Sequence, residues 1–419
     1  MFPNDPLRMV ARLTICLLTL LPQTSAAEPQ IARTIDGQAF AAELVAVSDQ
    51  HVITFRTAGG ERAIDAVDLV HWSHPVYWSQ PAQPRRGAQV LLADGSLLLG
   101  ELVQIADDRL RFLTGEFGDL NLSLQHVRGV LLLPPDDAPR RDKLTDEILS
   151  KSNMSDRLVL VNGDELSGMI RSLANGELTL ETELGVIPVE LSRIVALLFS
   201  ATVGSPPDPP GVTTPGFTML VGLRDGSLLR AASLRMSAEA VELRLGDGTL
   251  LASKAPRNIV SLQPLGGQAV YLSDLEAHAY LHIPYLDAKW PYHTDRNVLG
   301  TRLRCGGRLY SKGLGMHSAA RVTYKLPNPK SPSSFRTFQA ELAIDDQAGK
   351  QGSVTFRLFT SDGGDWTERF ASPMVRGGDR PRAVSVDIRG ALALSLAVDY
   401  ADRADVLDHA NWLNARLIK

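Results

Sequence analysis

Short runs of alternating hydrophobic and polar residues fill most of this chain, and glycine or aspartate turns separate them. In one such run Leu110 and Phe112 alternate with Arg109 and Arg111, which places one face inward with the two-residue period of a β-strand. The same alternation recurs in the later stretches RVTYKL, TFQAELAI, SVTFRLFT and ALALSLAV. We therefore expect an all-β protein.

Four segments share one pattern. An apolar strand runs into Asp-Gly or Asn-Gly, a second strand follows, and two alternating strands, a polar stretch and a final apolar run complete each copy. Such dipeptides favour a two-residue type I′ hairpin, because both central positions need positive φ. The dipeptides are Asp36-Gly37, Asp94-Gly95, Asn162-Gly163 and Asp225-Gly226, and the segments are 30–80, 87–135, 156–200 and 217–266.

Five short strands with a polar break before the last predict a small closed barrel, and the pattern resembles Sm-like and SH3-like barrels. The repeat period of about 60 residues differs from common solenoid periods, so we expect separate beads rather than a continuous stack. The net charge of -4 and the absence of basic segments argue against nucleic-acid binding. The modules are expected to serve as spacers or as contact sites for proteins of the cell envelope.

Three stretches of changed composition mark the joints. SQPAQPRRG separates the first two modules, and the proline-rich GSPPDPPGVTTPG precedes the fourth as a stiff linker. The joint PPDDAPRRDKLTDEILSKSNMSD lies between the second and third modules, and its centre is expected to form one short amphipathic helix.

The N-terminus has the pattern of a signal peptide over residues 1–27. Arg8 and Arg12 flank or precede the apolar run LTICLLTLLP, and small residues up to Ala27 provide a cleavage site. Translation from Met9 instead of Met1 would give a more compact signal. A lipoprotein at Cys16 is disfavoured because bulky Ile15 precedes it.

Removal of the signal would leave Cys305 as the sole cysteine, which excludes an intramolecular disulfide and a cysteine-based zinc site. No later stretch is long and apolar enough to span a membrane. We expect a secreted or periplasmic bacterial protein.

The sequence changes character at about Tyr271. Five of the nine histidines and three of the five tryptophans follow this point. Regular strands with glycine and aspartate turns over residues 268–419 predict an antiparallel β-sandwich.

Four motifs occur in order here: Lys-Gly-Leu-Gly-Met-His at 312–317, Ile344-Asp345-Asp346, Gly352-Ser353-Val354, and Asp-His-Ala-Asn-Trp at 408–412. Residues from about 272 to 417 resemble the NPCBM/NEW2 family, a carbohydrate-binding module found beside glycoside hydrolases of family 98 type. The resemblance implies a galactose-binding-like jelly roll that binds sugars, with galactose-type glycans as candidates. It does not cover the four modules.

Aromatic side chains that stack on a pyranose ring are expected in a sugar site. Trp290, Tyr292 and Trp366 are the candidates, and Trp366 stands in a loop, where function concentrates. His317 is either a sugar contact or a buried histidine that fixes two loops. The glycines before it are expected to make a bend into the next strand, with Lys312 as an exposed charge.

The carboxylates give further alternatives. Neighbouring Asp345 and Asp346 point to opposite faces of a strand, so they cannot be a glycosidase pair, although Asp346 is a candidate sugar contact. Asp408 and His409 either contact sugar or lock the last strand to the Gly-Met-His run, with Trp412 in the core. The spacing of Asp399, Asp402 and Asp405 fits either a structural calcium site, in line with the family resemblance, or a solvated loop.

Three functions remain open. The preferred one is an exported, non-catalytic carbohydrate-binding protein, because no G-x-S-x-G motif occurs and no segment suits a (β/α)₈ hydrolase barrel of about 250 residues. The second is an envelope scaffold without a sugar site. The third is a glycoside hydrolase with an unrecognised site.

Overall fold

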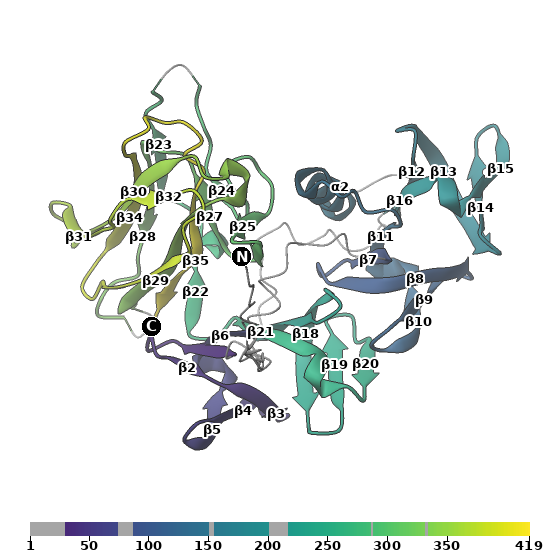
Figure 1. The fold of residues 1–419 in the computed structure, drawn as a ribbon, viewed down its shortest axis with the longest axis horizontal. Coiled ribbons are helices and arrows are strands. Elements are labelled where there is room, and N and C mark those ends of the chain that lie inside the picture. The colour runs from purple at the N-terminus through teal and green to yellow at the C-terminus, as the bar shows by residue number, and fades with distance from the viewer. Residues whose placement is uncertain (1–29, 74–86, 151–154, 201–216, 286–287, 332–333) are drawn as a thin grey trace, which may run out of the picture.

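The computed structural model describes residues 30–73, 87–150, 155–200, 217–285, 288–331 and 334–419. The expected signal peptide and much of two joints lie outside these residues. In the part described, no helix is long and apolar enough to cross a membrane. The chain forms a row of four small barrels with a β-sandwich at one end (Figure 1).

Each repeated segment folds as one barrel, and we call the barrels modules 1 to 4. A meander of strands leads into a single 3₁₀ turn, after which the last strand returns to pair with the first. The strands of module 1 are β1 (Ile31–Thr34), β2 (Ala39–Ala41), β3 (Glu43–Val47), β4 (Val52–Thr57), β5 (Gly60–Asp65) and β6 (Leu69–Ser73). Those of module 2 are β7 (Ala88–Leu92), β8 (Leu97–Ala106), β9 (Arg109–Thr114), β10 (Gly118–Ser123) and β11 (Val127–Leu131).

Modules 3 and 4 repeat this plan. Module 3 comprises β12 (Asp156–Leu160), β13 (Glu165–Ala174), β14 (Glu177–Thr182), β15 (Gly185–Glu190) and β16 (Ile194–Leu198). Module 4 comprises β17 (Thr218–Leu223), β18 (Leu228–Met236), β19 (Val241–Leu245), β20 (Leu250–Ser253) and β21 (Ile259–Leu265). The 3₁₀ turns are η1 (Ala66–Asp68), η2 (Leu124–His126), η3 (Leu191–Arg193) and η4 (Pro256–Asn258).

The hairpins at the Asp-Gly and Asn-Gly dipeptides differ from the predicted type I′ turn. In module 2, Leu92 N donates to Ser96 O (2.9 Å) and Gly95 N donates to Leu92 O (3.0 Å), so three residues form the loop. Only Gly95 has positive φ, at 86°. The prediction of type I′ was wrong because a type I turn followed by a left-handed glycine also uses this dipeptide. The other three modules repeat the same two hydrogen bonds.

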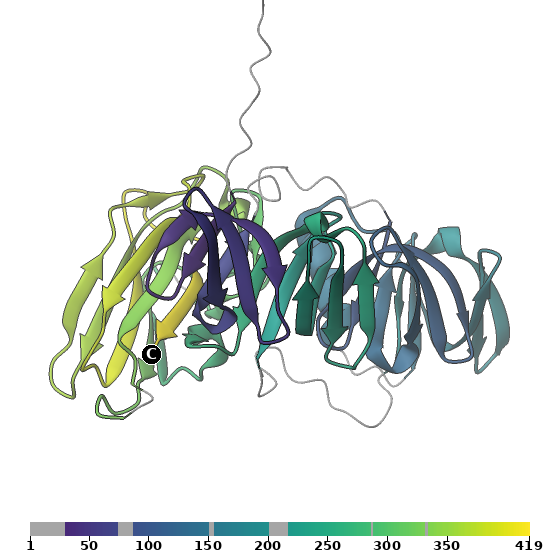
Figure 2. The same cartoon turned by 90° about the horizontal axis from the view of Figure 1, so that it is seen from below.

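The four modules form one continuous row, which corrects the expectation of separate beads. Strands β6 and β21 join modules 1 and 4, strands β8 and β18 join modules 2 and 4, and strands β11 and β16 join modules 2 and 3. One apolar cluster extends through all four modules. The spatial order is therefore 1-4-2-3, and Figure 2 shows it as a row beside the sandwich.

The contact between modules 2 and 4 is reciprocal. Ser227 Oγ accepts from Leu99 N (3.0 Å), and Ser96 Oγ accepts from Arg230 N (2.9 Å). Both serines follow the Asp-Gly dipeptide and are buried. Module 3 has exposed Asp164 at the same position. A charged side chain there suits the solvated end of the row.

The predicted helix between modules 2 and 3 is confirmed as α2 (Ala138–Ser150). It lies against β7 and β11, where Ile148 is buried beside Leu131 and Leu198. Its other side faces the sandwich (Figure 1). There Arg304 forms a bidentate ion pair with Asp142, and Arg296 forms one with Asp146. The helix thus connects the row of modules to the sandwich.

The sandwich has two main sheets. We call the first the covered sheet: β24 (His293–Thr294), β27 (Gly313–Met316), β35 (Ala410–Ile418), β29 (Thr337–Ile344) and β33 (Arg382–Asp387), with β22 (Ala269–Tyr271) paired to β35. The second is the open sheet: β23 (Ala279–His282), β28 (Ala320–Lys325), β34 (Ala393–Tyr400), β30 (Ser353–Ser361) and β31 (Thr367–Ala371), with β32 (Val375–Arg376) paired to β30.

The sandwich core lies between these sheets. Trp412, predicted as a core residue, is fully buried and meets Phe338 and Phe356 edge to face. Hairpin β25 (Leu303–Cys305) and β26 (Arg308–Tyr310) packs on the outer side of the covered sheet, and the 3₁₀ turns are η5 (Leu272–Asp274) and η6 (Asp346–Ala348). Gln339 of the covered sheet also donates to Ile35 O of module 1 (2.8 Å). The outer face of the covered sheet is therefore interior to the molecule.

Two expectations for the Lys-Gly-Leu-Gly-Met-His run were wrong. Residues 313–316 form strand β27 rather than a bend, and Gly315 is needed because a Cβ would come within 2.4 Å of Arg296 O. Lys312 is buried rather than exposed, since its ammonium group pairs with Asp274 and with Asp295 at 3.0 Å. The two carboxylates keep the buried ammonium charged and raise its pKa, although desolvation opposes them.

Candidate functional site

Loops from both sheets meet at one end of the sandwich, which we call the apical end. His282 ends β23, and Trp290 stands in the loop that follows. His317 comes directly after β27, and His409 directly before β35. Strand geometry thus brings together side chains that are up to 127 positions apart in the sequence (282 to 409).

The rings of these residues form a histidine–tryptophan cluster. Trp290 and His317 stack with centroids 4.9 Å apart and an interplanar angle of 6°. His409 lies 6.2 Å from His317 and 6.4 Å from Trp290, centroid to centroid. His282 accepts a hydrogen bond from Trp290 N at Nδ1 (3.2 Å). Three of the predicted sugar contacts, Trp290, His317 and His409, therefore lie together.

The histidines of this cluster are neutral at ordinary pH. Burial lowers the pKa of His317 to about 4, and it also lowers the pKa values of His409 and His282. A neutral imidazole has one donor and one acceptor nitrogen, which matches the hydroxyl groups of a sugar. The buried Nδ1 of His409 has no hydrogen-bond partner among the described residues.

Asp408 adjoins the cluster and is fully buried. Its Oδ1 accepts from Ser353 N (2.8 Å) at the start of β30. Burial raises the pKa of this carboxyl to about 6. The contact with Ser353 joins the last loop to the open sheet, and the side chain has no exposed surface through which to reach a ligand directly.

Tyrosines support the loop that carries Trp290. Tyr280 donates its hydroxyl to Trp290 O (2.8 Å), and Tyr292 lies 4.9 Å from the Tyr280 ring. Tyr292 therefore braces the loop that carries Trp290. Sequence reasoning missed the exposed pair Tyr285 and Tyr400, whose centroids are 6.1 Å apart. No local pattern predicts this pair, because Tyr285 follows β23 whereas Tyr400 is the last residue of β34.

Two other predicted sugar contacts lie elsewhere. Asp346 accepts from Gly306 N (2.7 Å) and Gly307 N (2.8 Å), so its carboxylate fixes the turn between β25 and β26. Trp366 stands before β31 on the side of the open sheet, with 42% of its surface exposed. Neither residue shares a ring contact with the histidine–tryptophan cluster among the described residues.

The three aspartates of the expected calcium site are not gathered. Asp399 pairs with Arg357 at 3.2 Å, and Asp402 pairs with Arg376 at 2.6 Å. Asp405 instead acts electrostatically on His317 and Asp408. In the described ranges, no group of three or more His, Cys, Asp or Glu residues is placed to hold a metal ion.

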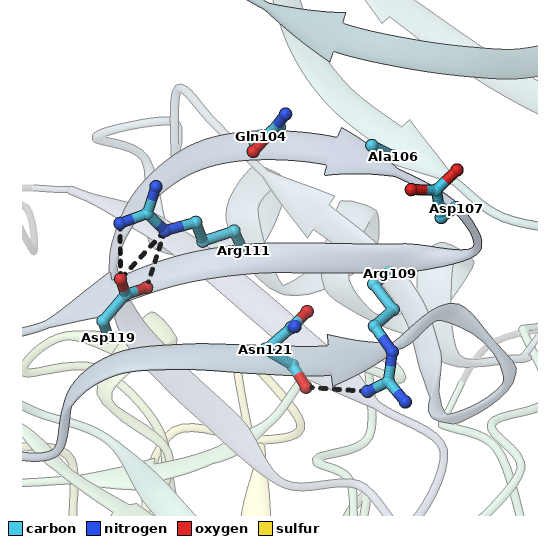
Figure 3. A pocket seen from close by; sticks show the side chains of 7 residues that line it. All are labelled: Gln104, Ala106, Asp107, Arg109, Arg111, Asp119 and Asn121. Carbon is cyan, nitrogen blue, oxygen red and sulfur yellow. Dashed lines mark hydrogen bonds and ion pairs between the residues drawn. The ribbon is translucent and has the colours of Figure 1, made fainter.

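A polar depression of about 390 Å³ on module 2 also escaped sequence reasoning. Figure 3 shows it on the sheet formed by β8, β9 and β10. Asp119 binds Arg111 across two strands (2.6 to 3.0 Å), and Gln104 and Asn121 face the same surface. Because its main charges already neutralise each other, this surface has weaker ligand chemistry than the apical end.

Residues 268–418 match the NPCBM/NEW2 domain. Among curated relatives, a predicted endo-alpha-N-acetylgalactosaminidase of Renibacterium salmoninarum is 29% identical over 119 residues, which cover 28% of this chain and 7% of the relative. Alpha-1,3-galactosidase B of Akkermansia muciniphila is 30% identical over 122 residues, covering 29% of this chain and 14% of the enzyme. The chain thus matches only a small fraction of either relative.

A solved structure of the CBM51 module from Clostridium perfringens GH95, in complex with methyl-galactose, is 22% identical and covers 36% of this chain and 99% of that chain, with a TM-score of 0.30. The fold assignment therefore rests on the observed sheets rather than on this superposition. The motifs at 312–317 and 408–412 predicted the family match, and residues 268–418 are an NPCBM/NEW2 domain.

Proposed function

We propose that this protein is an exported, non-catalytic carbohydrate-binding protein, and that its sandwich binds a galactose-type sugar at the histidine–tryptophan cluster. The observation that carries the proposal is the stacked pair Trp290 and His317, with neutral His409 beside it. An aromatic face suits the apolar face of a pyranose ring, and imidazole nitrogens suit its hydroxyl groups. The galactose-type specificity follows the names of the two curated relatives.

A binding role fits the carboxylates better than a hydrolytic one. A glycosidase needs a carboxylic acid that reaches the glycosidic oxygen and a second carboxylate across the bond. Asp408 has the raised pKa of a general acid, but it is fully buried and binds Ser353 N. Asp345 is equally buried and accepts from Arg304 N (3.0 Å) and from Asn411 Nδ2 (2.8 Å).

The row of modules would then serve as a platform. Its ion pairs from α2 and the Gln339 contact engage the covered side of the sandwich. The apical end and the open sheet are not part of these contacts. A surface-bound or multivalent glycan would therefore meet the sandwich without displacing the modules.

Titration of the full chain with galactose and N-acetylgalactosamine, followed through the tryptophan indole NMR signals, tests the proposal. We expect the Trp290 signal to shift. Trp290→Ala should weaken binding by at least about tenfold, because truncation of a central aromatic contact typically costs more than 1.4 kcal/mol. Mannose serves as the sugar control, and Trp366→Ala as the matched protein control.

Absence of any galactose-type binding at millimolar concentration by the folded wild-type chain would refute the proposal. Equal binding by wild type and Trp290→Ala would instead move the site away from the cluster.

A further inference from the structure

A second group of side chains on the sandwich has ligand chemistry of another kind. Strand β28 directs Arg321 to the outer face of the open sheet, where its cross-strand neighbours on β34 and β30 are Ala397 and Arg357. The adjacent row places Phe359 beside Ser395. Ala397 on the central strand thus lies between two arginines, and Ser395 lies between Thr323 and Phe359.

The guanidinium group of Arg321 is held in one position. Its Cζ lies 4.6 Å from the Phe359 ring centroid and 5.1 Å from the Trp366 centroid. Its Nε donates to Ser395 Oγ (2.7 Å). Two rings and one hydroxyl therefore orient the group, and the Nη end of the fork makes no hydrogen bond among the described residues.

Charge distinguishes Arg321 from the arginine across the sheet. Arg357 is neutralised by Glu368 and by Asp399 (3.2 Å). No salt bridge joins Arg321 to a carboxylate in the residues that the structure describes. Asp399 acts on Arg321 only electrostatically. A fixed cation without a salt bridge among the described residues, next to a 42% exposed tryptophan, has the features of a receptor for an anionic sugar.

We propose that Arg321 and Trp366 form a second sugar site, and that this site binds a carboxylate-bearing sugar such as a uronic acid. The planar carboxylate would accept two parallel N–H bonds from the Nη groups, which is the geometry that a guanidinium fork favours. The indole of Trp366 would cover the apolar face of the sugar ring. This site shares no residue with the histidine–tryptophan cluster and does not depend on the galactose proposal.

D-galacturonate and D-galactose test the site because they differ only in the C6 carboxylate. With the full chain, galacturonate should shift the Trp366 indole signal, while galactose should leave it unchanged. Arg321→Gln should weaken galacturonate binding roughly tenfold or more, since hydrogen bonds to charged groups are the stronger class. Arg321→Lys, which keeps the charge without the fork, should give an intermediate loss.

Arg376→Gln is the matched control, because it removes one positive charge from the same sheet at an arginine already paired with Asp402. It should leave galacturonate affinity unchanged. Thermal unfolding of each variant verifies that it is folded, and Arg321→Lys carries the test if Arg321→Gln is not.

Unchanged galacturonate affinity in a folded Arg321→Lys or Arg321→Gln variant would overturn the proposal, as would a wild-type Trp366 signal that does not respond to galacturonate. Equal binding of galactose 6-sulfate would overturn the assignment to a carboxylate. Loss of galactose binding in Trp290→Ala, with galacturonate binding retained, would support two separate sites.

Discussion

The two outer faces of the sandwich present similar side chains to different surroundings. On the covered side, Arg304 lies buried against Asp142, and Gln339 binds the backbone of module 1. On the open side, Arg321 lies over two aromatic rings and forms no salt bridge among the described residues. Arg304 therefore stabilises the contact between the helix and the sandwich, whereas the guanidinium group of Arg321 faces solvent on the open sheet and could bind a ligand.

The largest expected effect concerns the covered side. Arg304→Ala should reduce the free energy of unfolding by about 3 kcal/mol or more, because it leaves Asp142 buried without its partner. Denaturant unfolding measures the loss. Arg111→Ala is the control, since it breaks a bidentate pair with Asp119 that is exposed to solvent. Equal losses of unfolding free energy in the two variants would contradict the expectation that the buried ion pair contributes more to stability than the exposed one.

A glycine pair extends the comparison to the backbone. Gly315→Ala in the covered sheet should cost about 1–3 kcal/mol or more, because the new Cβ would lie 2.4 Å from the Asn297 backbone. Gly364→Ala, in the loop before Trp366, would place its nearest contact at 3.6 Å and should change stability by less than about 1 kcal/mol. Thermal unfolding distinguishes the two, and similar melting temperatures would contradict the packing at Gly315.

The apical end should respond to pH in a characteristic way. Galactose affinity should stay nearly constant from about pH 8 to about pH 5, fall about twofold by pH 4 and fall roughly tenfold by pH 3, because His317 becomes protonated and loses its acceptor nitrogen. Calorimetric titration over this range measures it. A midpoint near pH 6.5, the value of an unperturbed histidine, would show that the ring is not desolvated.

Folding stability should change less than binding over the same range, because two shifts oppose each other. The lowered pKa of His317 makes its contribution decline as the pH falls from 6.5 toward 4. The raised pKa of Asp408 favours the folded state as the pH falls from about 6 toward 3.8. Unfolding measured without sugar separates these effects from ligand binding.

The smallest expected effect is on the open side. Trp366→Ala should lower stability by about 1 kcal/mol or less, the usual range for an exposed cation–π contact. Denaturant unfolding measures it. A loss above about 2 kcal/mol would mean that Trp366 belongs to the structural core rather than to a binding surface.

Local pattern was sufficient for part of the candidate site. Trp290, His317 and His409 were proposed from residue type and motif, and the structure brings them together. Asp346 was also a candidate sugar contact, but its carboxylate accepts hydrogen bonds from the backbone of Gly306 and Gly307. Residue type alone does not reveal which groups already have a partner.

The sequence by itself determined the strands, the positions of the Asp-Gly and Asn-Gly turns, helix α2 and the core position of Trp412, because periodicity and turn composition are properties of neighbouring residues. Only the tertiary structure decided the 1-4-2-3 order of modules and the pairing of Asp142 with Arg304, which are 162 residues apart. It also decided that Arg304 is buried and that Arg321 is partly exposed. Such contacts form between surfaces assembled from distant segments, so the local periodicity of the sequence does not predict them.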